Sequence, residues 1–241
     1  MGSGSGSTGT GSNGGQILTG QYQQTHVEND YAVQNNAYNI GGGSQEIETT
    51  PAGFTLVSVA GSAPTNGAPL SYPSIFLGCA YTLCSIDSPL PEQLSDINSA
   101  TSSIDYTYPT GGTWDASYDI WLDPQPLTNG VNQQEIMIWF NHQGSIQPVG
   151  HVVGDDDIDG KDFTVWEGSN GQNQVVSYVA DTPISSWHNF NVLGFIDNTE
   201  TLEPAMTDSW YLTSVQAGFE PWSGGAGLAI NNFSANVNGT S

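Results

Sequence analysis

The stretch QQEIMIWF, from Gln133 to Phe140, holds the first residue placed for chemistry. Read as a β-strand, it directs alternate side chains to opposite faces, so that Glu135, Met137 and Trp139 share one face. The other face is apolar and typical of a core: Ile136, Ile138 and Phe140. A carboxylate in line with a thioether and an indole indicates a lined groove.

A second acidic strand precedes this one. SYDIWLD, residues 117–123, places Asp119 and Trp121 on one face, and the turn-rich DPQPLTNG after it predicts a hairpin. If the hairpin turns near Leu127, Asp119 lies about opposite Glu135 on the same face. Two carboxylates facing each other across a strand pair destabilise a sheet, so we expect this pair to serve a site.

A third carboxylate stands in SVQAGFEPWSGG, residues 214–225. Gln216, Gly218 and Glu220 share one strand face, and Trp222 follows directly in a glycine-rich setting. Burial beside an indole disfavours the charged form of a carboxyl group and raises its pKa.

These carboxylates suit glycosidic bond cleavage, which needs a proton for the leaving oxygen and a carboxylate near the anomeric carbon. Glu135 and Glu220 each lie on an alternating strand among aromatic and apolar residues. No Ser-His-Asp or Cys-His arrangement has local support, and no glycine-rich loop precedes a helix to cradle phosphate. The histidines lack metal-ligand spacing: His26, His142, His151 and His188. A carbohydrate-binding sandwich without turnover remains the alternative.

One acidic run competes as a cation site. DDDIDG, from Asp155 to Gly160, fits the first half of a calcium loop. Trp166 stands at position twelve, where such a loop needs glutamate, and Glu167 comes one place late. Asp159-Gly160 favours a hairpin turn instead. We therefore expect no metal site and no cofactor.

The elements that position the carboxylates are strands, because β-formers and turn residues are abundant while helix-favouring charged residues are scarce. At 241 residues the chain fits one all-β domain. We expect residues 1–20, rich in Gly, Ser and Thr, to be a flexible linker or tag, and residues 21–241 to form the single domain. The one helix candidate covers residues 199–212 or a part of them, and it is interrupted by Pro204.

The net charge of -23 sets one cation, Lys161, against 24 acids. This balance excludes nucleic acid and anionic membranes as partners, and no stretch is apolar enough to span a bilayer. It also favours adaptation to acid, where carboxylates are neutral and few positive charges remain. Cys79 and Cys84, five residues apart, indicate a local disulfide rather than a metal pair. We expect a secreted, extracellular monomer.

Four segments together resemble glycoside hydrolase family 12, the β-jelly-roll endo-β-1,4-glucanases and xyloglucanases. They are YAVQNNAYN, YPSIFLGCAYTLCS, YDIWLD with QQEIMIWFNHQGSIQPVG, and VQAGFEPWSGGAGLAI. The resemblance spans roughly residues 25–237 and is most specific in the E-I-M-I-W and G-F-E-P-W runs. It implies two packed antiparallel sheets, the concave one forming a substrate cleft, and a retaining double displacement.

By position, the resemblance implies that Glu135 is the nucleophile, Glu220 the acid/base, and Asp119 the carboxylate that supports the nucleophile. Asn36, Met137 and Trp139 match cleft-lining residues, and Cys79–Cys84 matches a disulfide of some bacterial members. Tyr38 stands where the family usually has Trp. To this substrate-binding set we add the neighbours of the groove: Gln147, Pro148 and Trp222.

The expected function is a secreted, acid-adapted endo-β-1,4-glucanase that cleaves internal bonds of a β-glucan with retention of configuration. A xyloglucan-specific endoglucanase and a non-catalytic, lectin-like carbohydrate-binding sandwich are the alternatives. The residues do not separate cellulose, mixed-linkage glucan and xyloglucan as substrates.

Overall fold

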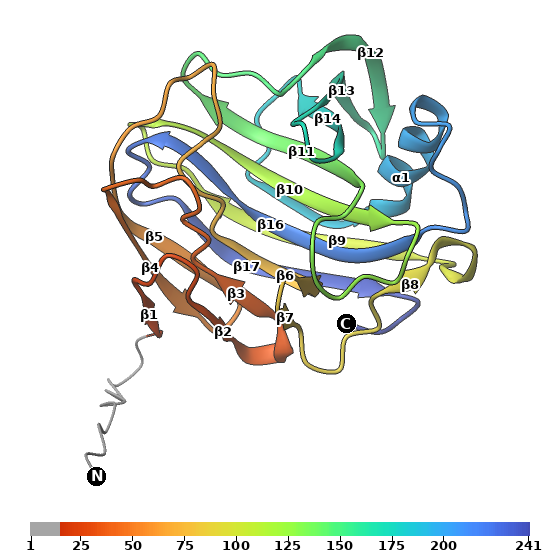
Figure 1. Cartoon of the computed structure of the whole chain (residues 1–241), viewed down its shortest axis with the longest axis horizontal. Coiled ribbons are helices and arrows are strands. Elements are labelled where there is room, and N and C mark those ends of the chain that lie inside the picture. Colours follow the sequence, from red (N-terminus) through yellow and green to blue (C-terminus); the bar gives the residue numbers. More distant parts are fainter. Residues whose placement is uncertain (1–14) are drawn as a thin grey trace.

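The computed structural model describes residues 15–241 of the chain. Its strands form two sheets that pack face to face (Figure 1). The smaller sheet has six strands, in the order β1 (Ile17–Leu18), β4 (Ser44–Thr50), β5 (Gly53–Ala60), β17 (Ala229–Val237), β9 (Ala100–Thr107) and β15 (Ser186–Asn191). The predicted jelly-roll sandwich of two sheets is confirmed.

The larger sheet carries the candidate site. Its order is β12 (His151–Ile158), β13 (Lys161–Ser169), β14 (Gln174–Ala180), β11 (Gln134–Gln143), β10 (Thr113–Asp123), β16 (Tyr211–Ser223), β6 (Ser74–Ala80), β3 (Ala32–Gln34) and β2 (Gln24–His26). Two short strands, β7 (Leu83–Cys84) and β8 (Glu92–Gln93), pair with β6 and β16. Neighbouring strands are antiparallel except β11 and β14, which run parallel.

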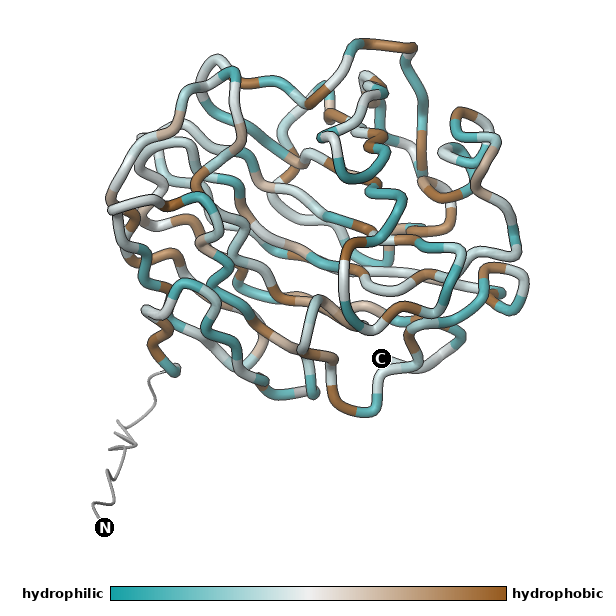
Figure 2. Tube along the Cα trace, viewed as in Figure 1, coloured by the Kyte–Doolittle hydropathy of each residue, from teal (hydrophilic) through white to brown (hydrophobic). Residues whose placement is uncertain are grey.

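The core lies between the sheets, and β10 shows how the sequence places it there. Its even-numbered residues, from Trp114 to Leu122, are at most 1% exposed and belong to the main apolar cluster. Its odd-numbered residues, from Asp115 to Trp121, turn to the opposite face of the larger sheet, as a period of two requires. Figure 2 shows the resulting mixture of hydrophobic and hydrophilic residues along the strands.

The predicted linker, residues 1–20, extends too far at its C-terminal end. Residues 1–14 of it lie outside the described part of the chain, but Ile17 pairs with Glu48 and Leu18 pairs with Ile47 as strand β1. Leu18 is fully buried. The ordered domain therefore begins before Gln21, because an apolar residue inside the Gly/Ser-rich stretch joins the core.

The helix also lies earlier than the sequence pattern predicts. α1 covers Val192–Leu202 and ends before Pro204, which cannot continue a helix. Its buried residues show the helical spacing that identifies it: Val192, Phe195, Ile196 and Thr199. Two 3-10 turns, η1 (Glu28–Asp30) and η2 (Leu94–Asp96), complete the helical elements of residues 15–241, and none of these elements combines the length and apolarity needed to cross a membrane.

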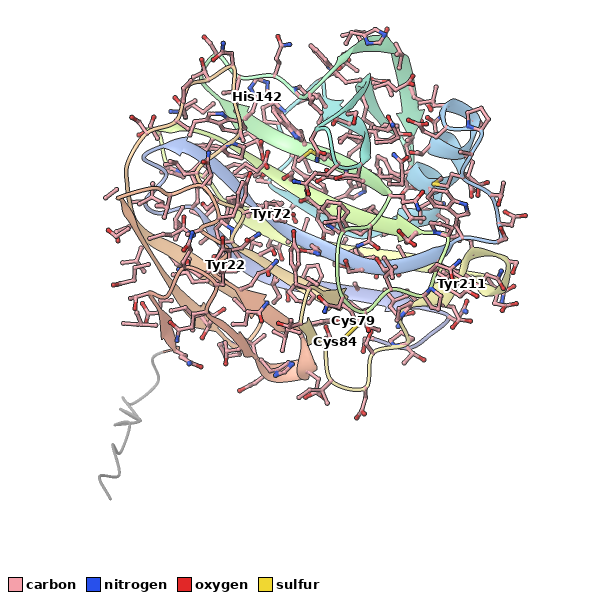
Figure 3. The ribbon with its side chains drawn as sticks, in the orientation of Figure 1. Tyr22, Tyr72, Cys79, Cys84, His142 and Tyr211 are labelled. Atoms are coloured by element: carbon pink, nitrogen blue, oxygen red, sulfur yellow. A yellow bond between two sulfur atoms is a disulfide. The ribbon has the colours of Figure 1, made fainter. Side chains whose placement is uncertain are left out.

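Two local predictions are confirmed. Cys79 and Cys84 form a disulfide that joins β6 to β7 (Figure 3). Asp159 and Gly160 form a two-residue turn between β12 and β13, with Ile158 opposite Lys161. Both turn residues have positive φ, +54° and +77°, as the primed hairpin turns demand.

Candidate active site

Strand β10 is the axis of the site, because it pairs with β11 on one side and with β16 on the other. Asp119 lies opposite Met137 of β11, while Glu135 lies opposite Trp121. The predicted register, with Asp119 about opposite Glu135, is therefore off by two residues, while the predicted face is unchanged. The centre of the hairpin lies one residue later than predicted, in a loop whose ends are held by the Asp123 carboxylate. A shift of two keeps the same face, so Asp119 and Glu135 are diagonal neighbours.

The loop after β10 explains the register. Asp123 Oδ1 accepts a hydrogen bond from the Gln125 backbone at 2.9 Å, and Oδ2 accepts one from the Gln133 backbone at 3.1 Å. One carboxylate thus closes both ends of the connection. The turn residues alone do not predict that the Asp123 carboxylate binds both ends of this connection.

Four carboxyl groups share one face of three neighbouring strands: Asp115 and Asp119 of β10, Glu135 of β11 and Glu220 of β16. Asp115 is 0%, Asp119 3% and Glu135 8% exposed, and Glu220 is half-buried. Burial raises the pKa of each of the four carboxyl groups. The cluster therefore retains protons at a pH where isolated carboxyl groups are ionised.

Glu135 is held by two amides that the sequence did not reveal. Asn173 Nδ2 donates to Glu135 Oε2 at 3.0 Å, and Asn170 Nδ2 donates to the same oxygen at 3.4 Å. Burial raises the pKa of Glu135 to about 7, and the Asn173 hydrogen bond opposes that rise. Both amides come from the turn before β14, which runs parallel to β11. In the sequence, only the turn-rich run SNGQN, residues 169–173, marks the position of these two amides.

Asp115 is the second residue that sequence reasoning missed. It lies directly opposite Glu220, and hydrogen bonding from Glu220 and the Ser117 side chain opposes the effect of burial on the pKa of Asp115. Two ionised carboxylates cannot hydrogen-bond to each other, so the pair is satisfied when a proton lies between them. The pKa of Glu220 is raised by burial and then by the negative charge of Asp115. The sequence could have indicated Asp115, because Asp115 and Asp119 are four residues apart and therefore lie on the same face of one strand.

The predicted binding residues divide into two groups. Met137, Trp139 and Trp222 come together as a buried apolar cluster beside the carboxyl groups, joined by Ile146 of the β11–β12 loop. Trp222 Nε1 donates to the Gly67 carbonyl at 2.8 Å, so Trp222 fixes a loop. Trp139 Nε1, by contrast, is buried with no hydrogen-bond partner in the described chain.

The remaining predicted residues lie in loops. Gln147 is exposed and Pro148 is buried, and neither has a hydrogen bond to the carboxyl cluster in residues 15–241. Tyr38 is 40% exposed, and the charges of Glu220 and Glu135 add to burial in raising its pKa. Asn36, half-buried at φ +36°, accepts the backbone hydrogen bond of Tyr72 through its carbonyl. Tyr38 therefore lies within electrostatic reach of the carboxyl groups.

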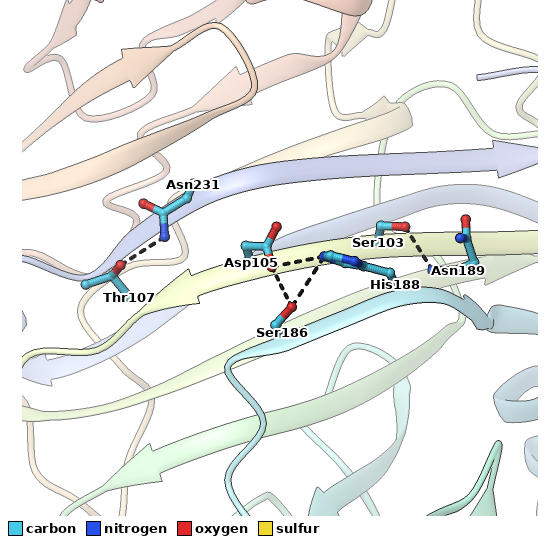
Figure 4. A network of polar contacts seen from close by, with 7 residues as sticks. All are labelled: Ser103, Asp105, Thr107, Ser186, His188, Asn189 and Asn231. Carbon is cyan, nitrogen blue, oxygen red and sulfur yellow. Dashed lines mark hydrogen bonds and ion pairs between the residues drawn. The ribbon is translucent and has the colours of Figure 1, made fainter.

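A Ser, a His and an Asp do meet elsewhere, on the exposed face of the smaller sheet (Figure 4). His188 Nε2 lies 3.0 Å from Asp105 Oδ1 and 3.3 Å from Ser186 Oγ. A catalytic triad needs the two partners on different ring nitrogens. Because one nitrogen faces both, this trio is a surface hydrogen-bond network.

Comparison with known proteins places this geometry in context. Residues 29–238 match the family model described as Glycosyl hydrolase family 12. "Probable cellulase Cel12b" of Mycobacterium tuberculosis is 63% identical over 149 residues, covering 62% of this chain and 97% of that protein. "Inactive glycoside hydrolase XLP1" of Phytophthora nicotianae is 30% identical over 153 residues, covering 61% of this chain and 63% of that protein.

A solved structure agrees over a longer span. The native structure of the cellulase "Endo-1,4-beta-glucanase CelB2" has 48% sequence identity and a TM-score of 0.89, and the match covers 92% of this chain and 99% of that one.

Proposed function

The chain belongs to glycosyl hydrolase family 12, and on this premise we propose that it cleaves internal β-1,4 bonds of glucans with retention of configuration. Its place among glycoside hydrolases of the endoglucanase type follows from the family; the stereochemistry, the site roles and the setting are our proposal. One observation carries it: Glu135 and Glu220 lie on the two strands that flank β10, on one face.

In the first step, an oxygen of Glu135 forms a bond to the anomeric carbon while the bond to the leaving oxygen breaks. Glu220 gives its proton to that leaving oxygen. In the second step, Glu220 takes a proton from water, the water oxygen bonds to the anomeric carbon, and Glu135 is released. The raised pKa of Glu220 supports its role as the acid, because it keeps the proton available.

The surroundings of Glu135 support its role as the nucleophile. Asn170 and Asn173 hold Oε2, which leaves Oε1 for attack. Asp119, diagonal to Glu135, supports it by sharing one proton with it, so that the pair carries a single negative charge. The negative charge of Glu135 adds to burial in raising the pKa of Asp119, which favours the singly charged pair.

The glucan would lie across the face that carries the four carboxyl groups. The exposed Tyr38 ring offers stacking to a sugar, and the unpaired Trp139 Nε1 offers a donor to a hydroxyl group. A buried donor without a partner is costly until a ligand satisfies it. Cellulose, mixed-linkage glucan and xyloglucan all present such hydroxyl groups.

Secretion and acid adaptation belong to the same proposal. The Cys79–Cys84 disulfide suits an oxidising, extracellular environment. The raised pKa values of the carboxyl cluster, together with the net charge of -23, favour a fold that is most stable in acid. A monomer is proposed because no described feature requires a second copy.

The test measures reducing-sugar release from carboxymethylcellulose, barley β-glucan and xyloglucan from acidic to neutral pH, with Glu135→Ala alongside. We expect turnover by the wild type and a loss of at least about a thousandfold in the mutant. NMR of the first product anomer reports retention. Binding without turnover on all three glucans would favour the carbohydrate-binding alternative, and turnover of xyloglucan alone would favour the xyloglucan-specific one.

A further inference from the structure

Within the proposed reaction, we propose that Tyr72 is a positioning residue. Its hydroxyl donates a hydrogen bond to Asp119 when the Asp119–Glu135 pair carries its negative charge, and so holds the charged pair in place for attack. Tyr72 precedes β6 and belongs to none of the strands that bear the carboxyl groups. The inference rests on the roles proposed for Glu135 and Asp119.

The Tyr72 ring is fixed on the site face by a glycine. A Cβ atom on Gly218 would lie 2.5 Å from the Pro73 carbonyl oxygen, and 2.8 Å from Cε2 and 2.9 Å from Cζ of Tyr72, so the ring and the backbone of the next residue both pack directly on Gly218. Gly218 is opposite Ser117, midway along β10 between Asp115 and Asp119. Tyr72 is 5% exposed, and Figure 3 shows it where β10 and β16 run side by side.

The Tyr72 hydroxyl has one proton and two acceptors. It donates to the Ser117 carbonyl at 3.3 Å, at the point where the β10–β11 register shifts. The second acceptor is Asp119, whose buried Oδ1 has no hydrogen-bond partner among residues 15–241, and Tyr72 lies close enough to lower the pKa of that carboxyl group as a donor. Tyr106 of β9 donates to the same Ser117 carbonyl at 3.3 Å from the core side. Because Tyr106 satisfies that carbonyl, the Tyr72 proton can turn to Asp119 without leaving a buried acceptor unpaired.

Electrostatics keeps Tyr72 a donor. Burial, followed by the charge of Asp119, raises its pKa, so the hydroxyl stays protonated. In return, its hydrogen bond opposes the effect of burial on the pKa of Asp119. The titratable groups that act on Tyr72 or Asp119 come from four elements: Asp115 of β10, Glu135 of β11, Glu220 of β16 and Tyr106 of β9. None of them is a cation, so a neutral donor is the available stabiliser of the charge.

The test compares Tyr72→Phe with a matched control, Tyr106→Phe. Each removes one hydroxyl from the Ser117 carbonyl, but only Tyr72 reaches Asp119. In Tyr72→Phe we expect kcat/KM to fall roughly ten- to a hundredfold, as for a lost hydrogen bond to a charged group, with KM unchanged. The acid limb of the pH profile should move up by about one unit, because the pair ionises less readily. Tyr106→Phe should keep the wild-type limb.

Gly218→Ala perturbs the position of Tyr72 while the hydroxyl remains, because its methyl group would overlap the Pro73 carbonyl oxygen as well as the Tyr72 ring. It should give the same shift of the acid limb. If Tyr72→Phe keeps the acid limb of the pH profile and the kcat of the wild type, the inference is overturned. An equal shift in Tyr106→Phe would also overturn it, since the effect would then come from the Ser117 carbonyl.

Failure of the proposed function has a separate signature, namely a wild type that cleaves no glucan. The inference is then tested by carbon-13 NMR titration of the carboxyl groups. Asp119 in Tyr72→Phe should ionise at higher pH than in the wild type, whether or not a glucan is cleaved. An unchanged titration would refute the inference alone.

Discussion

Replacing Glu135 by glutamine should stabilise the folded protein at neutral pH and leave its stability in acid nearly unchanged. The folded-state pKa of Glu135 is raised from 4.5 to about 7 by burial. A carboxyl group whose pKa is raised by folding binds more protons in the folded state than in the unfolded state, so stability falls as pH rises. The loss begins near the unfolded pKa and is complete above the folded one.

The magnitude follows from the shift. A difference of about 2.5 pK units at about 1.36 kcal/mol each gives roughly 3 kcal/mol of destabilisation from the charged form. Glutamine removes that charge, and its own oxygen still accepts from Asn173. For a chain of this size, roughly 3 kcal/mol corresponds to a rise of about 6–12 °C in Tm at neutral pH.

The assay is thermal unfolding of the wild type and Glu135→Gln at a pH below 4.5 and at a pH above 7. Glu28→Gln is the matched control, because Glu28 is an exposed glutamate on η1. The control should shift Tm little at either pH. An equal Tm difference between wild type and Glu135→Gln at both pH values would refute the reasoning, since the effect would then come from packing rather than charge.

Two further predictions concern the second carboxyl pair and the disulfide. Asp115→Asn removes a charge that raises the pKa of Glu220, so the carbon-13 NMR titration of Glu220 should move to lower pH; an unmoved titration would show that the two groups do not share a proton. Replacing Cys79 and Cys84 by serine opens a five-residue separation and should cost about 2 kcal/mol, or roughly 4–8 °C in calorimetry, with kcat/KM retained. Loss of activity in the folded double mutant would contradict this.

The sequence predicts which face of its strand each site residue occupies, because side chains alternate along a strand. Glu135, Asp119 and Glu220 lie on the expected face, because a period of two is a local property of each strand. Their register is not local. It depends on the loop that Asp123 closes and on the shift at Ala116–Ser117, and neither leaves a pattern in the strands themselves.

Asn173 and Tyr72 were missed for the same reason: each reaches the site through a contact between distant parts of the chain. Asn173 meets Glu135 because β14 runs parallel to β11, and a parallel pair requires a long crossover that turn patterns do not specify. Tyr72 reaches Asp119 from a loop before β6. Asp115 differs, since its place on the site face follows from alternation with Asp119, and only its partner Glu220 depends on the fold.

The scarcity of cations in the composition determines how the charge of the carboxyl cluster is compensated. The described chain has one lysine, Lys161, and its Nζ lies over the Trp187 ring at 5.0 Å. Burial lowers the pKa of His142, the histidine opposite Asp115, which favours its neutral form. With no cation paired to the cluster among residues 15–241, its charge is compensated by neutral donors and by protons. The pH of the solution therefore sets the protonation of the cluster directly, and this couples the stability of the fold to pH. It also means that neutral donors such as Tyr72 and Asn173 must stabilise the single negative charge that nucleophilic attack requires.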